Sequence, residues 1–139
     1  SHLTILEQAP GEDLTNEFII SGIIDKFSLQ FELSWKVLKE LLLYEGKSEG
    51  HTGSPREIIK AAYVCFDFIE EEVWLSMLKD RNDTAHIYSK ELSLGLLKRI
   101  LEQYIPAFQR LKDSIDRHYG FLMSYNMDCE VARWTRRRM

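Results

Sequence analysis

Residues 81–88 place three side chains that suit phosphate chemistry within eight positions: Arg81, His86 and Tyr88. A guanidinium can donate two parallel hydrogen bonds to phosphate oxygens, and an imidazole can exchange protons near neutral pH. On one unbroken helix Arg81 and His86 would point about 140° apart, because five residues make more than one full turn. Residues 82–84 are weak helix formers and good helix caps, so they predict a break that would let both side chains reach one cleft.

The same residues also have an interpretation that involves no reaction. Arg81 would pair with a nearby acid, and His86 would satisfy a buried carbonyl group. Short motifs match by chance often enough that the spacing alone leaves both interpretations open.

The elements that must position these residues are helices. Glycine and proline are scarce, with 7 and 3 residues, and the hairpin dipeptides Asn-Gly and Asp-Gly are absent. Apolar residues recur with the three-four spacing of amphipathic helices. This pattern predicts an all-α, antiparallel up-and-down bundle of four to five helices, with its principal helices at about 13–44, 54–66, 70–81 and 90–115.

Several residues mark where these helices begin, bend and end. Asp13 or Thr15 is expected to cap the long first helix, and Ser54 begins a capping box. Pro106 should kink the last helix, because its ring blocks the preceding turn. The periodicity fades after about residue 116, which predicts a bundle over 1–116 and a C-terminal extension over 117–139 that is basic at its end.

Composition narrows the class of protein. A chain of 139 residues has room for one domain, and 12% aromatic residues can fill a core. The formal net charge of −4 argues against nucleic-acid binding through bulk positive charge. Apolar runs such as 41–44 are far too short for a membrane span. Cys65 and Cys129 form no motif and are expected to be reduced thiols in a cytoplasmic protein, and the four histidines lack metal-ligand spacing.

Three segments, residues 27–46, 54–61 and 72–88, resemble the HEPN superfamily. Within it they resemble the branch of nucleotidyltransferase substrate binding proteins, over roughly residues 17–115. The resemblance implies a helical bundle that forms a homodimer. It also implies a metal-independent endoribonuclease that acts on RNA and needs no cofactor of its own, with Arg81, Asn82 and His86 at the positions of its motif.

The resemblance further implies a partner. Chains of this branch are typically encoded beside a small nucleotidyltransferase, which acts as the antitoxin to an RNase toxin. The partner uses ATP to adenylylate a tyrosine that follows the motif, and Tyr88 stands at the matching position. This chain has no nucleotidyltransferase motif of its own, so we expect the transfer activity to reside in the neighbouring gene product.

Two alternatives to the toxin remain open. One is a non-catalytic subunit that binds the substrate or nucleotide of a two-component nucleotidyltransferase, and the other is a bundle that only dimerises. Arg56, Lys60 and Lys79 are candidate phosphate or RNA contacts around Arg81, although solvated helix faces explain such cations equally well. The tryptophans and phenylalanines on the apolar stripes are interpreted as core residues.

Overall fold

The computed structural model describes residues 2–87 and 89–119. Tyr88, Cys129 and all other residues of 120–139 therefore lie outside the described part of the chain. The described residues are almost entirely helical and contain no strand, which confirms the predicted all-α class. None of their helices is both long enough and apolar enough to cross a lipid bilayer.

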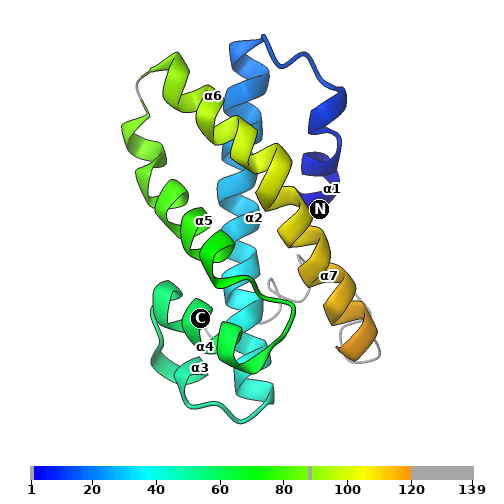
Figure 1. Cartoon of the computed structure of the whole chain (residues 1–139), viewed down its shortest axis with the longest axis vertical. Coiled ribbons are helices and arrows are strands. Elements are labelled where there is room, and N and C mark those ends of the chain that lie inside the picture. The colour runs from blue at the N-terminus through cyan, green and yellow to red at the C-terminus, as the bar shows by residue number, and fades with distance from the viewer. Residues whose placement is uncertain (1, 88, 120–139) are drawn as a thin grey trace, which may run out of the picture.

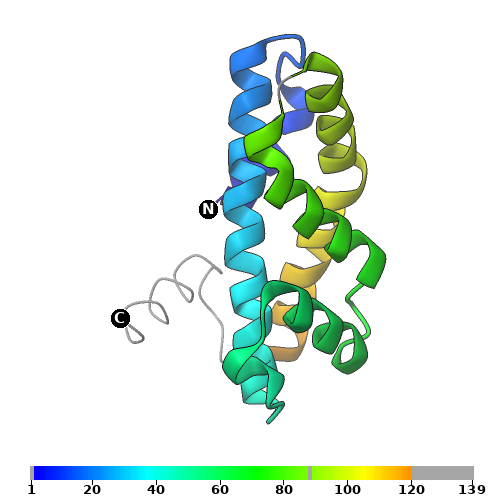
Figure 2. The ribbon, with the colours of Figure 1, turned by 90° about the vertical axis from the view of Figure 1, so that its left-hand side faces the viewer.

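A long helix, α2, is the spine of the molecule, and the other helices pack along it (Figure 1). Helix α5 runs antiparallel to α2, and the continuous rod α6–η3–α7 then runs in the same direction as α2 (Figures 1 and 2). Helix α1 lies against α2 and α7. This is the predicted up-and-down arrangement. In chain order the elements are α1 (His2–Glu7), η1 (Ala9–Gly11), α2 (Glu17–Tyr44), α3 (Glu49–Thr52), α4 (Pro55–Cys65), α5 (Glu71–Asp83), η2 (Thr84–His86), α6 (Lys90–Arg99), η3 (Ile100–Tyr104) and α7 (Ile105–Tyr119).

The start of α2 corrects one prediction. Asn16 is the N-cap, and its side-chain oxygen accepts hydrogen bonds from the amides of Phe18 and Ile19 at 2.9 and 3.3 Å. Asp13 instead accepts hydrogen bonds from the amide and hydroxyl of Thr15 at 3.0 and 2.6 Å. The two residues predicted as caps are thus occupied with each other in a turn before the helix, which also lowers the pKa of Asp13.

The start of α4 follows the predicted signal. The Ser54 hydroxyl accepts a hydrogen bond from the Glu57 amide at 3.3 Å, with Pro55 in the first turn. Before it, Gly46 ends the α2 segment with a φ of 75°, a left-handed conformation that only glycine adopts without strain. Both residues therefore stand where the backbone requires them.

The last helix passes Pro106 without a break. A π-helical turn, η3, immediately precedes α7, and Pro106 is the second residue of α7. The proline has no N–H to donate and its ring needs room in the preceding turn, so the chain widens there. The sequence signal at Pro106 thus coincides with this wider turn, and the predicted kink stays a prediction, since helices also bend at π-helical turns. The helix continues to Tyr119, and the division between residues 1–116 and 117–139 stays a prediction.

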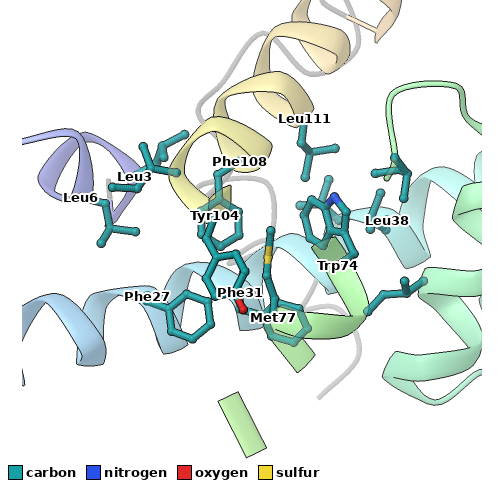
Figure 3. Packing of buried hydrophobic residues seen from close by; sticks show 14 of the residues in the cluster. Leu3, Leu6, Phe27, Phe31, Leu38, Trp74, Met77, Tyr104, Phe108 and Leu111 are labelled. Atoms are coloured by element: carbon teal, nitrogen blue, oxygen red, sulfur yellow. The ribbon is translucent and has the colours of Figure 1, made fainter. Parts of the chain in front are cut away.

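An aromatic cluster holds α2, α5 and the last helix together (Figure 3). Phe27 stacks on Tyr104 with ring centroids 5.2 Å apart, and Trp74 meets Phe108 edge-on at 5.8 Å. Phe31 lies between them, 6.3 Å from Trp74. All five rings are buried, so these aromatic residues are core, as predicted, and do not line a nucleotide pocket.

Candidate functional site

The end of α5 carries the residues that the sequence singles out. Arg81 and Asn82 lie in the last turn of α5, which ends at Asp83. The chain then tightens into the short 3₁₀ turn η2, where the Thr84 hydroxyl donates to the carbonyl of Arg81 at 2.8 Å. The predicted helix break is therefore present, and it places His86 on a separate turn.

Arg81 is directed toward α2. Its Nη1 donates to Glu32 Oε2 at 2.9 Å, and its guanidinium carbon lies 5.5 Å from the centre of the Phe31 ring. Glu32 also lies 3.5 Å from the ammonium group of Lys36. The pairing of Arg81 with an acid, which the sequence left open, is thus real, but 28% of the Arg81 side chain stays exposed. The pair fixes the guanidinium in a partly exposed position, with its Nε buried and without a hydrogen-bond partner.

The preceding residue, Asp80, is anchored on the opposite side. Its carboxylate accepts two hydrogen bonds from Arg99, at 2.8 and 3.0 Å, and a short one from the Tyr104 hydroxyl. Ser76 lies 2.6 Å from the same hydroxyl. Burial and the hydrogen bond to Asp80 raise the pKa of Tyr104 to about 12. The hydrogen bond to Asp80 also raises the pKa of Arg99.

An open groove lies between the start of α4 and the second half of α5. It has a volume of about 540 Å³. Of the predicted contacts, Arg56 and Lys79 line it together with Arg81 and Asn82, whereas Lys60 is exposed on α4 and is not among the lining residues. The full lining is Ser54, Pro55, Arg56, Leu75, Leu78, Lys79, Arg81, Asn82 and Asp83.

The other half of the predicted site lies apart from this groove. His86 is exposed on η2 and is not among the residues that line the groove. Tyr88, the predicted regulatory residue, lies outside the described residues. In a single chain the structure therefore groups Arg81 and Asn82 with Arg56 and Lys79, and does not bring His86 into that group.

The sequence analysis gave no role at the site to the residues that hold Arg81 in place. Phe31 is predicted as a core residue and Glu32 follows it directly, but Arg81 is 49 residues beyond Glu32 in the sequence. Asp80 precedes Arg81 directly, yet its own partners come from the last helix. The signal that could have found them is an acidic residue on an otherwise apolar helix face. Among residues 2–87 and 89–119, no group of three or more His, Cys, Asp or Glu side chains is placed to hold a metal ion.

The family model described as nucleotidyltransferase substrate binding protein like matches residues 2–117. The chain belongs to this family. The match covers every described helix except the last residues of α7, and it confirms the branch that the sequence resembles. The family description links such chains to a nucleotidyltransferase. No curated protein matches the chain significantly.

Proposed function

We propose that this member of the nucleotidyltransferase substrate binding-like family is a metal-independent endoribonuclease and the toxin of a two-gene module. One observation carries the proposal: Arg81 and Asn82 border an open groove with two further cations, and the helix ends directly after them. A phosphodiester can enter such a groove from solvent. His86, exposed on the next turn, is then accessible to the same backbone once the protein dimerises.

The reaction is transesterification within the RNA chain. The ribose 2′-oxygen attacks the adjacent phosphorus and loses its proton, while the bond to the 5′-oxygen of the next nucleotide breaks and that oxygen gains a proton. His86 takes part in this proton exchange, and Arg81 stabilises the negative charge on the phosphorane. Asn82 orients the phosphate. The products are a 2′,3′-cyclic phosphate and a 5′-hydroxyl end, with no metal ion or cofactor of this chain required.

Cleavage of RNA by the purified protein in the presence of a chelator tests the assignment. His86→Ala should lose roughly 10²- to 10⁴-fold in rate, the usual contribution of a general acid or base. His51→Ala is the matched control, because it makes the same change at an exposed histidine on α3. A His86→Ala variant as active as wild type would refute the proposal.

Regulation by the neighbouring nucleotidyltransferase is the second part of the proposal. The phenolic oxygen of Tyr88 attacks the α-phosphorus of ATP bound to the partner, and pyrophosphate leaves. The added AMP blocks the cleft and brings negative charge to the place where substrate phosphate binds. Co-expression with the transferase should add the mass of AMP, Tyr88→Phe should abolish it, and Tyr63→Phe should retain it. An AMP mass that persists in the Tyr88→Phe variant counts against this assignment.

A second candidate function follows from the family description itself, which names substrate binding. In that case the groove presents a substrate to a separate nucleotidyltransferase, and this chain catalyses nothing. The two candidates differ in where activity resides. Nucleotidyl transfer that requires this chain, with no RNA cleavage by the chain alone, would establish the second.

A further inference from the structure

We propose that the groove between α4 and α5 binds the single-stranded RNA next to the cleaved phosphate. Arg56 and Lys79 would contact flanking phosphates. The inference rests on the proposed endoribonuclease function and names the binding surface for its substrate. It assigns to Arg56 and Lys79 a role in holding the polymer that is separate from the roles of Arg81 and His86 in the reaction.

The size and openness of the groove fit a passing chain. Its volume of about 540 Å³ falls within the roughly 300–1,000 Å³ of sites that hold a small organic ligand. The groove is open to solvent rather than enclosed, so a bound nucleotide can continue into its neighbours on both sides. An enclosed cavity would favour a free nucleotide instead.

The charge of the groove contrasts with the rest of the bundle. Residues 1–116 carry 13 basic and 20 acidic side chains, so most of the surface repels a polyanion. The groove instead is lined by three cations, Arg56, Lys79 and Arg81, and by the carboxylate of Asp83. Because Arg81 is also paired with Glu32, a local excess of one positive charge remains. Positive charge that gathers locally on an acidic body directs a phosphate backbone to that place.

Three of the residues that line the groove are apolar. Leu75 and Leu78 are half-buried and pack against the core, and Pro55 is half-buried at the start of α4. Half-buried apolar side chains beside exposed cations suit the face of an unpaired base or a ribose, with the phosphates at the cations. Asn82 adds an amide that can donate to and accept from a base edge. Bases are accessible in this way only in single-stranded RNA, since the deep, narrow major groove of an RNA duplex hides them.

The test measures binding of a fluorescent single-stranded oligouridine in the His86→Ala background, where the RNA stays intact. Lys79→Ala should weaken binding roughly five- to tenfold, the loss expected for one exposed charge-assisted contact. It should also reduce the slope of log affinity against log salt by about 0.7. Lys112→Ala, the same change at an exposed lysine of α7, should leave both unchanged. Arg56→Ala should resemble Lys79→Ala.

Equal RNA binding by the Lys79→Ala and Lys112→Ala variants would overturn the groove assignment. A Lys79→Ala variant that loses more affinity for ATP than for RNA would overturn it as well. Cleavage by the otherwise wild-type chain separates this failure from failure of the proposed function. Cleavage that requires His86 but not Lys79 would support the endoribonuclease and refute the groove as its RNA-binding surface. RNA binding that requires Lys79, without any cleavage, would support the groove and refute the endoribonuclease.

Discussion

The substitution Tyr104→Phe tests how firmly the end of α5 is attached to the last helix. The Tyr104 side chain is fully buried in the π-helical turn, and its ring stacks on Phe27. Its single phenolic proton is donated to Asp80, so the Ser76 hydroxyl must donate its own proton to the phenolic oxygen. Removal of that oxygen deletes both hydrogen bonds and keeps the ring in the core.

The cost follows from these two hydrogen bonds. A hydrogen bond to a charged group contributes roughly 1.5–3 kcal/mol, and one between neutral groups roughly 0.5–1.5 kcal/mol. Asp80 keeps its two hydrogen bonds to Arg99, which limits the loss on that side. We therefore expect a decrease of about 2–3 kcal/mol in the free energy of unfolding, or a fall of roughly 6–10 °C in Tm for a domain of this size.

Urea denaturation followed by circular dichroism measures this decrease at pH 7. Tyr119→Phe is the matched control, because Tyr119 also donates to a carboxylate, Glu45, at 2.7 Å, but at the surface. Its removal should cost less than about 1 kcal/mol. A Tyr104→Phe variant as stable as Tyr119→Phe would show that the network does not secure α5, and would refute the reasoning.

The raised pKa of Tyr104 gives the same prediction a pH dependence. The pKa is about 12 in the folded chain against an ordinary value of 10.0. A folded-state pKa above the unfolded value means that this contribution is complete below pH 10 and is lost as the pH rises toward 12. The phenylalanine variant has no such proton. The difference in stability between wild type and Tyr104→Phe should therefore narrow between pH 10 and 12, by up to roughly 3 kcal/mol.

Further substitutions test the cap, the ion pair and two glycines, each by equilibrium denaturation. Ser54→Ala should cost about 1 kcal/mol, since the first turn of α4 loses its side-chain cap. A double-mutant cycle with Glu32→Gln and Arg81→Gln should give a coupling energy of about 0.5–1 kcal/mol, because both side chains are partly exposed. Gly22→Ala should stabilise by about 0.5–1 kcal/mol, as a methyl group there meets nothing within 4 Å. Gly53→Ala should destabilise by about 1–3 kcal/mol, because its methyl group would lie 2.7 Å from a backbone oxygen.

Local signals in the sequence were sufficient where local physics decides the structure. The capping box at Ser54, the left-handed Gly46 and the acidic start of α5 are each read within a few residues of the element they mark. The apolar stripes likewise gave the aromatic core. Local competition caused the one wrong cap: Asp13, Thr15 and Asn16 are all good capping residues, and hydrogen bonds between the first two decide in favour of the third.

The surroundings of Arg81 could not be predicted, because they depend on distant partners. Arg81 meets Glu32 across 49 positions, and Asp80 meets Arg99 across 19. Which acid pairs with which cation follows from how α5 packs between α2 and the last helix, and a single sequence does not contain that packing. The π-helical turn could not be predicted in full either, because Pro106 indicates an irregular turn but does not specify a π-helical one.

Two consecutive residues fix the end of α5 from opposite sides. Asp80 is held by the last helix and Arg81 by α2, so the guanidinium that would bind phosphate is positioned before any substrate arrives. His86, only five residues later, is exposed on the short turn that follows α5. Under the proposed function, Arg81 is thus held for phosphate binding within one chain, and proton transfer depends on how the substrate reaches His86 on η2. Under that function a second copy would cover this exposed turn, and an AMP group on Tyr88 would add negative charge where substrate phosphate binds.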